Sequence, residues 1–345
     1  MLEKTSQSPG SMQKIGSGIL WGVPAKVSLI QTPTPLHRLN HLSAQLGLDL
    51  WIKRDDLTGL AMGGNKGRKL EYLLAEAIAQ RADVVVTCGS TQSNFIRQLG
   101  ASCAQFGIRC AAMTMVLARS DYNPMPTVPS MLSSGGNVWL DEILGVELHV
   151  IPNGTWDEMY AAMEELALGF EAEGLRVFRC PIGGSSALGA YSFVKAAEEI
   201  AEQAAAFDSI VFATSSGSTQ TGLQVGFHGK PTKIIGIACD PEPDLVDDFA
   251  ALSEQLADLT GTTPRLSAED FNLNLDYVGP GYGVPSEAGN AAIQRLARTE
   301  GIFLDPIYSG KAFSGLLDLA ERGELTGRVL FWHTGGLPAL FAMPS

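Results

Sequence analysis

Short apolar runs alternate with amphipathic stretches along this chain, and this alternation constrains its fold more than any other feature. Residues 84–88 form an apolar run, residues 94–106 have the spacing of a helix, and residues 109–116 are apolar again. A strand, a helix and a second strand in this order form a βαβ unit, in which the two strands are parallel. The sequence therefore predicts a parallel sheet with helices packed on it.

A second series of the same kind predicts a second group of strands. Residues 209–213 and 233–240 have the character of strands, and residues 220–228 and 244–259 have the character of helices. We therefore predict an α/β protein with two open, twisted-sheet domains, helices on both faces of each sheet, and a cleft between them. Ligands of such sheets bind at the carboxyl ends of the strands, where loops meet helix N-termini.

Two breaks in this pattern predict how the chain divides into domains. One lies near Lys66, and the other is the segment 181–186, which contains two adjacent glycines. If the chain crosses between the domains at both breaks, residues 1–66 and 186–345 form a large domain. Residues 67–185 then form a small α/β domain.

Two segments do not follow the alternation. Residues 120–136 contain three prolines and two adjacent glycines, which predicts an irregular loop near the cleft or a subunit contact. The first twenty residues are polar and rich in Gly and Ser, and they lack the apolar core of a signal peptide.

Composition and charge exclude several classes of partner. The chain has 345 residues, of which 45% are hydrophobic, enough for two domains with substantial cores. Its net charge of −13, without any Lys/Arg-rich block, argues against nucleic acid. No apolar run approaches the roughly 20 residues that cross a bilayer. We therefore expect a cytoplasmic protein without nucleic-acid or membrane partners.

The pattern of cysteines predicts neither a disulfide framework nor a metal site. Their number is odd, their spacing is wide and no CxxC pair occurs. Most lie in apolar runs, which predicts small buried hydrophobic residues rather than redox groups. They are Cys88, Cys103, Cys110, Cys180 and Cys239.

A lysine after a pair of glycines is the first candidate for chemistry. Lys66 follows Gly63-Gly64-Asn65 and precedes an apolar, helix-like run. Glycines let the backbone approach a ligand closely, and a nearby cation such as Lys69 lowers a lysine's pKa, which favours the neutral, nucleophilic amine. Such a lysine can form a Schiff base with a carbonyl cofactor. The alternative is a solvated surface lysine, the usual state of this residue.

A hydroxyl-rich loop offers a site for phosphate. Ser215-Ser216-Gly217-Ser218-Thr219 lies between an apolar strand and a helix, where N–H groups and hydroxyls can bind a phosphate together. A tight turn without a ligand explains the loop equally well, and the loop is neither a P-loop nor a GxGxxG motif. A reactive amine and a distant phosphate site together favour pyridoxal 5'-phosphate (PLP).

Three further segments have turns that suit a ligand. Gly89–Asn94 links a strand to a helix, and its donors suit a carboxylate, although N-capping by Ser93 alone also explains it. Tyr282 and Tyr308 lie on glycine-containing loops, where a tyrosine is either a hydrogen-bond partner and proton carrier or a packing residue. His333–Gly336 is another turn after an apolar run, with or without a ligand.

Taken together, these segments resemble the 1-aminocyclopropane-1-carboxylate (ACC) deaminase and D-cysteine desulfhydrase family, PLP enzymes with the tryptophan synthase β-like fold (fold type II). The resemblance extends over nearly the whole chain, and its motifs follow one another in the family's order. The motifs are Thr32-Pro33-Thr34-Pro35-Leu36, Trp51-Ile52-Lys53-Arg54-Asp55-Asp56, Gly63–Leu70, Gln92-Ser93-Asn94, Gly217-Ser218-Thr219-Gln220 and Asp305–Lys311. An ordered series of this kind is far more specific than any one motif.

The resemblance implies a role for each candidate residue and places PLP in the cleft. Lys66 would carry the cofactor as a Schiff base, Lys69 would lie on its phosphate side, and Asn94 would lie near its phenolic oxygen. The implied catalytic residues are Lys66, Ser93, Tyr282 and Tyr308. The implied cofactor-binding residues are Asn65, Lys66, Lys69, Asn94, Ser216, Gly217, Ser218, Thr219 and Ser309. The implied substrate-binding residues are Gln92, Ser93, Asn94, Tyr282, Tyr308 and Thr334, and no metal is implied.

Two positions divide the family. ACC deaminases carry a glutamate where this chain has Ser309 and a leucine where it has Thr334, and both differences resemble the D-cysteine desulfhydrase branch. A carboxylate beside the pyridine nitrogen favours its protonated form and strengthens the electron sink, whereas a hydroxyl donates to a neutral nitrogen. The weaker sink suffices when a β-leaving group departs readily, and opening a cyclopropane ring has no such leaving group.

The resemblance therefore implies β-elimination from D-cysteine to pyruvate, ammonia and hydrogen sulfide by a homodimeric enzyme. Alternatives on the same scaffold are lyases for L-cysteate, 3-chloro-D-alanine or D-serine, and ACC deamination. An alternative of another class is a non-catalytic α/β protein that binds a phosphorylated small molecule, with Lys66 as an ion-pair partner.

Overall fold

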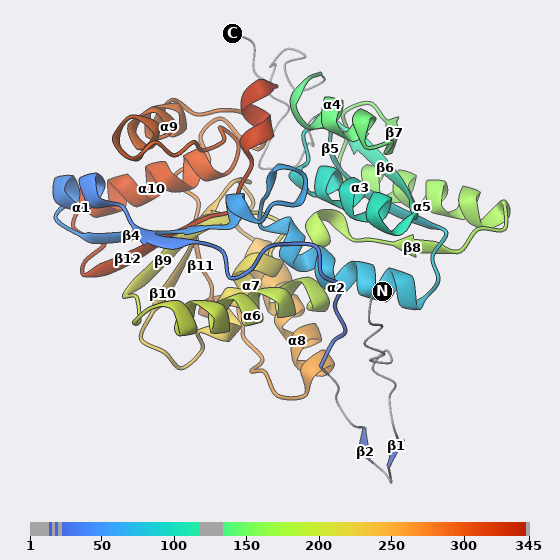
Figure 1. Cartoon of the computed structure of the whole chain (residues 1–345), viewed down its shortest axis with the longest axis horizontal. Helices are drawn as coiled ribbons and strands as arrows, with labels where there is room; N and C mark the ends of the chain where they lie inside the picture. Colours follow the sequence, from blue (N-terminus) through green and yellow to red (C-terminus); the bar gives the residue numbers. More distant parts are fainter. Residues whose placement is uncertain (1–13, 16–17, 20–22, 117–133, 343–345) are drawn as a thin grey trace, which may run out of the picture.

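The computed structural model describes residues 14–15, 18–19, 23–116 and 134–342, which form two large sheets flanked by helices (Figure 1). A third, two-stranded sheet pairs β1 (Lys14–Ile15) with β2 (Gly18–Ile19). The strands of the first large sheet lie in the order β11-β10-β9-β12-β4-β3, and those of the second in the order β7-β6-β5-β8.

The six-stranded sheet is parallel except at its edge, where β3 runs antiparallel to β4. Val211 of β9 packs toward α1, α9 and α10, whereas its neighbour Phe212 packs toward α6 and α7. Successive side chains of a strand point to opposite faces, so a strand covered on both sides is apolar throughout. The strands are β3 (Leu36–Arg38), β4 (Asp49–Arg54), β9 (Ser209–Thr214), β10 (Lys233–Ala238), β11 (Asn272–Asn274) and β12 (Arg328–His333). The helices are α1 (Asn40–Leu46), α6 (Ala187–Gln203), α7 (Ser218–Gly226), α8 (Leu245–Thr260), α9 (Glu287–Glu300) and α10 (Ser309–Glu321).

The four-stranded sheet is parallel throughout. Every residue of β5 is buried, because Val85 packs toward α2 and α3 while Val84 and Val86 pack toward α5. The strands are β5 (Val84–Ser90), β6 (Arg109–Met115), β7 (Glu147–Val150) and β8 (Val177–Arg179). The helices are α2 (Lys66–Ala79), α3 (Asn94–Phe106), α4 (Gly136–Ile143) and α5 (Trp156–Ala172).

The predicted fold class is confirmed: the chain is α/β, with two open sheets that each carry helices on both faces. The predicted helix at 94–106 has the same limits in the structure, because Ser93 caps its start and Gly107 (φ 66°) ends it. The helix predicted at 220–228 instead begins at Ser218 and ends at Gly226. It begins earlier because Gly217 (φ 96°) adopts a backbone conformation that turns the chain directly from β9 into α7.

The strands change from one sheet to the other twice, between Arg54 and Val84 and between Arg179 and Ser209. The predicted domain boundaries, 66/67 and 185/186, fall within these two intervals, and the division into domains stays a prediction. The loop predicted at 120–136 lies mostly outside the described residues, as does most of the polar segment at the start of the chain.

The five cysteines are free and buried, as predicted from their apolar surroundings. In the part of the chain that the structure describes, no helix combines the length and apolar character that a membrane span requires. The same residues contain no group of three or more His, Cys, Asp or Glu side chains arranged to hold a metal ion.

Candidate active site

A cavity of about 440 Å³ lies where strands of both large sheets end. Gly89 and Ser90 reach it from the end of β5, and Ala213 and Thr214 reach it from the end of β9. The loops after these strands, the first turn of α2, and residues of α5 and α8 also line it. The cavity thus occupies the position at which parallel α/β sheets bind ligands.

Two glycines bring α2 to the cavity. Gly63 (φ 73°) and Gly64 (φ 128°) have conformations that other residues avoid. A Cβ atom on Gly63 would lie 1.9 Å from the carbonyl oxygen of Asp56, and one on Gly64 would lie 2.6 Å from Nε2 of Gln98. The glycine pair is therefore required for the close packing of this turn.

Lys66 begins α2 and lies on the cavity wall with Asn65 and Lys69. Its amine is close to Gly183, where an added Cβ atom would lie 3.7 Å from Nζ of Lys66 and 2.5 Å from Oγ of Ser216. The structure thus brings Lys66 and the hydroxyl-rich loop after β9 to one site, although about 150 residues separate them in the sequence. Asn65 joins the same two segments, since its Nδ2 donates to Oγ1 of Thr219 at 3.2 Å.

Burial lowers the pKa of the Lys66 amine below its usual value. The neighbouring Lys69 amine is not the cause, because its contact with Lys66 acts in the opposite direction. Burial also lowers the pKa of Lys69 well below its usual value, and the charge of Lys66 lowers it further. Lys69 is held by a hydrogen bond of 3.1 Å to the carbonyl oxygen of Gly183. Each amine therefore holds its proton less firmly than an exposed lysine does, which favours the neutral amine.

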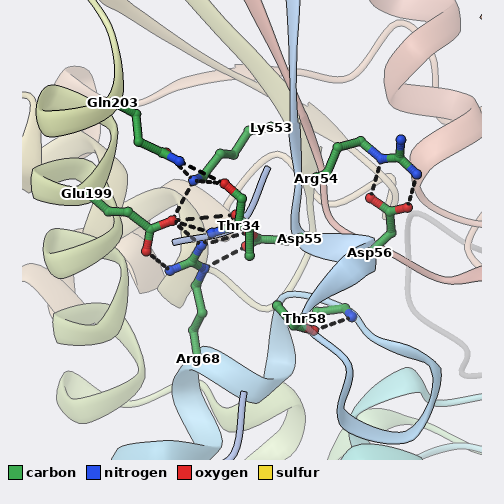
Figure 2. Close-up of polar contacts among 10 residues, drawn as sticks. Thr34, Lys53, Arg54, Asp55, Asp56, Thr58, Arg68, Glu199 and Gln203 are labelled. Atoms are coloured by element: carbon green, nitrogen blue, oxygen red, sulfur yellow. Dashed lines mark hydrogen bonds and ion pairs between the residues drawn. The ribbon is translucent and has the colours of Figure 1, made fainter. Parts of the chain in front are cut away.

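A buried ion network fixes the other side of α2. Figure 2 shows Arg68 between Asp55, at the end of β4, and Glu199 of α6. The guanidinium donates two hydrogen bonds of 2.8 Å to Asp55, and two of 2.8 and 3.0 Å to Glu199. Lys53 also pairs with Glu199, and its Nζ donates to the carbonyl oxygen of Thr34 at 2.9 Å. The first turn of α2, with Lys66, is thereby tied to β4 and α6.

The loop before α7 has one side-chain cap. Oγ of Ser185 accepts from the N–H of Ser218 at 3.3 Å. The N-cap residue itself, Gly217, has no side chain, so the later N–H groups of the first turn are left for a ligand. Ser216, Gly217 and Thr219 line the cavity. Ser218 does not; it is fully buried, and its Oγ lies 3.3 Å from Oγ of Ser185. Ser185, which sequence analysis did not assign to the site, does line the cavity.

In the loop after β5, some side chains line the cavity and others bond to neighbouring helices. Ser93 lines the cavity and also caps α3, because its Oγ accepts from the N–H groups of Phe95 and Ile96 at 3.2 and 3.3 Å. Asn94 also lines the cavity. Gln92 does not, since its Oε1 accepts from the N–H of Asn137 in α4 at 2.8 Å.

The two predicted tyrosines meet at the cavity wall. Their hydroxyl oxygens are 2.7 Å apart, and that of Tyr282 is 3.3 Å from Oγ of Ser90. Burial raises the pKa of Tyr282 to about 12 and that of Tyr308 well above its usual value. Both phenols are therefore protonated at neutral pH, and one donates to the other.

Thr334 and Ser309, the two residues expected to distinguish the branches of the family, differ in whether they reach the cavity. Thr334 lines the cavity, and its carbonyl oxygen accepts from the N–H of Asn65 at 2.9 Å. Ser309 is fully buried and does not line the cavity. Its hydroxyl donates to Oδ1 of Asp305 at 2.6 Å, so its single proton is already bonded. The neighbouring His333 is bonded as a neutral ring, because Nδ1 accepts from the N–H of Gly335 and Nε2 lies 2.8 Å from the carbonyl oxygen of Phe303.

Several cavity residues were not found from the sequence. Asp240 follows β10 at the carboxyl end of the sheet, and burial raises its pKa to about 7. Its place after an apolar run was the available signal. Glu242 and Asp248, with Trp156 and Tyr160 of α5, reach the cavity from helices and loops whose approach only the tertiary fold determines.

Comparisons with known proteins agree with this geometry. Residues 27–335 match the family described as "Pyridoxal-phosphate dependent enzyme". The chain is 41% identical over 329 residues to the D-cysteine desulfhydrases of Salmonella choleraesuis (strain SC-B67) and Salmonella paratyphi C (strain RKS4594), covering 92% of this chain and 95% of each relative. A solved structure described as an ACC deaminase homologue superposes with a TM-score of 0.81 at 36% identity, over 92% of this chain and 93% of the other. O-ureido-L-serine synthase, at 19% identity and a TM-score of 0.60 over 89% of this chain and 90% of the other, shares the fold.

Proposed function

Because this chain belongs to the pyridoxal-phosphate dependent enzymes, with PLP as its cofactor, we propose that it is a lyase that releases hydrogen sulfide from D-cysteine. The observation that carries the proposal is the meeting of Lys66, the α7 loop and the tyrosine pair at one cavity. The identity to D-cysteine desulfhydrases over most of both chains supports the choice of substrate.

The cavity has the donors and the amine that PLP requires. The start of α7 suits a phosphate group, and we assign the phosphate to Ser216, Gly217 and Thr219, whereas the N–H of Ser218 is bonded to Oγ of Ser185. Lys66 offers an amine with a lowered pKa for covalent attachment of the aldehyde. Asn94 and Lys69 complete the proposed cofactor contacts.

When bound, PLP supplies an electron sink for the electron pair left at Cα of the substrate. We propose that the Lys66 amine takes the Cα proton, since burial makes its neutral form accessible. The Tyr282–Tyr308 pair donates a proton to the departing sulfur, because both phenols are protonated at neutral pH. The hydroxyl of Ser93 holds the substrate carboxylate, and Gln92, which does not line the cavity, supports this loop through its hydrogen bond with Asn137. Water then replaces the amino group on the carbon skeleton, so one D-cysteine and one water give pyruvate, ammonia and hydrogen sulfide.

The branch of the family is proposed from two positions. No carboxylate follows Tyr308, and the hydroxyl of Ser309 is occupied by Asp305. The electron sink is therefore not strengthened from this position, which favours a substrate with a good β-leaving group over ACC. Thr334 adds a hydroxyl where ACC deaminases have an apolar side chain.

The charge of the cavity favours a β-substituent without a permanent negative charge. Three carboxyl groups line it, on Asp240, Glu242 and Asp248, and apart from Lys66 and Lys69, which we assign to the cofactor, its described wall contains no lysine, arginine or histidine. A sulfonate such as that of L-cysteate would be repelled. The thiol, chloride and hydroxyl groups of D-cysteine, 3-chloro-D-alanine and D-serine would not be repelled in this way, and leaving-group ability then ranks D-serine last.

A pyruvate-release assay tests the proposal. We expect turnover of D-cysteine and 3-chloro-D-alanine, and little with L-cysteine, D-serine, L-cysteate or ACC. Lys66→Ala is expected to lower turnover by about 10²–10⁴-fold or more, as for loss of a general base, and to abolish trapping of PLP by borohydride. Lys195→Ala, which removes an exposed lysine paired with Glu198, is the matched control. ACC as the best substrate, or an active Lys66→Ala protein, would contradict the assignment.

We also propose that the enzyme is a homodimer in the cytoplasm. Trp139 and Ile143 of α4 are 61% and 63% exposed, and Phe341 of the adjacent 3₁₀-helix η5 (Leu337–Phe341) is 71% exposed. Large apolar side chains gathered on neighbouring elements are typical of a subunit contact. Five free cysteines suit a reducing compartment. Analytical ultracentrifugation of Trp139→Glu is expected to give a monomer, and a wild-type monomer would contradict the proposal.

A further inference from the structure

Arg97 of α3 is a buried cation without a carboxylate partner. Its side chain is fully buried, and among the described residues it forms no salt bridge. It donates instead to four neutral oxygens: the carbonyl oxygens of Ala61 at 2.8 Å and Gly63 at 3.0 Å, Oδ1 of Asn94 at 2.7 Å, and Oδ1 of Asn137. Burying a charge among neutral groups lowers the free energy of unfolding. Arg97 therefore needs a role beyond stabilising the fold to explain its position.

Two carboxyl groups, those of Asp141 and Asp305, act on this charge from a distance, and neither forms a salt bridge with Arg97 among the described residues. Asp141 of α4 is buried, and neither of its carboxyl oxygens has a hydrogen-bond partner. Burial raises the pKa of Asp141 to about 8 even though the charge of Arg97 opposes this. The carboxyl is therefore largely protonated at neutral pH, and the positive charge of Arg97 remains uncompensated by it.

The contacts of Asn94 fix the direction of its amide. Its Oδ1 accepts from Arg97 at 2.7 Å and from Nδ2 of Asn137 at 3.1 Å. A guanidinium only donates, so the atom facing it must be the oxygen. Asn94 lines the cavity, whereas Arg97 and Asn137 do not. The group that Asn94 offers to the cavity is consequently Nδ2, and no described residue accepts from it.

We propose that Arg97 is a positioning residue which, with Asn137, turns the N–H groups of Asn94 toward the phenolic oxygen of PLP and stabilises the negative charge on that oxygen. The inference deepens the proposed function and rests on it. PLP has two anionic groups beside Lys66, and the start of α7 accounts for the phosphate. The phenolic oxygen is thus the anionic acceptor left for the amide of Asn94. A guanidinium behind an amide polarises it and strengthens its N–H donors.

The same guanidinium also holds the turn that leads to Lys66. Ala61 and Met62 have positive φ values of 43° and 68°, a conformation that is strained for residues with a side chain. The bonds from Arg97 to the carbonyl oxygens of Ala61 and Gly63 stabilise it. A test must therefore separate an effect on the phenolic oxygen from an effect on the fold.

Binding of two cofactors to the cofactor-free protein makes this separation. The probes are PLP and 3-deoxypyridoxal 5'-phosphate, which lacks the phenolic oxygen, and tryptophan fluorescence reports their apparent dissociation constants. Loss of a charge-assisted hydrogen bond corresponds to about a tenfold loss of affinity or more. We expect Arg97→Met to raise the dissociation constant for PLP by about this factor, and that for the deoxy analogue by less than about twofold.

Two further variants keep the test decisive. Gln98→Met is the matched control, because Gln98 is buried beside Arg97 on α3 and its Oε1 has no partner. Its Nε2 donates to the backbone carbonyl oxygen of Asn94 at 3.4 Å and not to the side-chain amide, so we expect unchanged affinity for both probes. Arg97→Lys keeps the charge but loses the planar set of guanidinium donors. It should weaken binding of PLP more than binding of the deoxy analogue, but by a smaller factor than Arg97→Met does. It replaces Arg97→Met in the test if that protein does not fold. Equal weakening of both probes, or no weakening, would overturn the inference. If the wild-type protein binds neither PLP nor the deoxy analogue, the proposed function itself is overturned.

Discussion

Replacing Gly217 by alanine is expected to weaken both the fold and cofactor binding, by an amount that the structure predicts. Gly217 has φ 96°, and a Cβ atom there would lie 2.5 Å from Cδ1 and 2.7 Å from Cε1 of Phe249, a fully buried residue of α8. The conformation alone costs an L-residue about 1–2 kcal/mol. Displacing a buried ring adds about 1–3 kcal/mol, which gives a total of about 2–5 kcal/mol.

The steric contact with Phe249 is expected to distort the proposed phosphate site. To relieve the contact, either α8 moves away or the loop before α7 moves toward the cavity, and Leu252 of α8, 3.2 Å from the same Cβ atom, also lines that cavity. A shift of the α7 N–H groups relative to Lys66 weakens phosphate binding. We expect the apparent affinity for PLP to fall about tenfold, which corresponds to about 1.4 kcal/mol.

Gly229 provides the matched control for this experiment. It also has a positive φ, 73°, but no atom lies within 4 Å of its added Cβ atom. Urea denaturation of the cofactor-free proteins should show a loss of about 1–2 kcal/mol for Gly229→Ala, with unchanged affinity for PLP. Equal losses of stability in the two variants would refute the steric argument. Wild-type affinity for PLP in Gly217→Ala would refute the assignment of this loop to the phosphate.

Three other changes test the network, the buried acid and the tyrosine pair. Arg68→Met leaves the carboxylate of Asp55 buried without its partner and should lower the free energy of unfolding by about 3–5 kcal/mol; a loss under about 1 kcal/mol in urea denaturation would contradict the role of the network. Asp141→Asn should stabilise the protein by about 1–3 kcal/mol at pH 8 and have no such effect near pH 4. The folded-state pKa of Asp141 is raised to about 8, so its contribution to stability is fully present below the unfolded pKa and is lost as pH rises toward 8; parallel stability–pH curves for the two proteins would rule this out. Tyr308→Phe should lower kcat for D-cysteine by about 10²-fold with little change in KM, since it removes a proton donor and keeps the ring that contacts Tyr282; unchanged kcat would remove the tyrosine pair from the mechanism.

The parts of the fold that depend on local patterns were predictable from the sequence. The apolar run at 84–88 and the helical spacing at 94–106 identified β5 and α3, because a strand buried on both faces is mostly apolar and Ser93 provides a side-chain cap. The early start of α7 was not predicted. It depends on the positive φ of Gly217. Phe249 packs so closely against this position that a residue with a Cβ atom does not fit there.

The site shows the same division between local and tertiary information. Most of the lysines, hydroxyls and tyrosines assigned by resemblance reach the cavity. The direction of each side chain depends on partners that no motif reveals, so Gln92 bonds to Asn137 and Ser309 to Asp305. Arg97 and Asn137 lie outside the cavity and behind its wall, where only the packed structure brings them together.

Two buried arginines act on the segment that carries Lys66, and their different partners indicate different tasks. Arg68 is neutralised by Asp55 and Glu199, a pairing that is complete before any ligand arrives. Arg97 reaches only neutral oxygens and is separated from the cavity by one amide. A charge that serves the fold alone is stabilised best by an opposite charge within the fold. A charge left unneutralised next to a ligand site is stabilised fully only when an anionic ligand binds, so that the stability lost in the free protein is recovered as affinity for the cofactor.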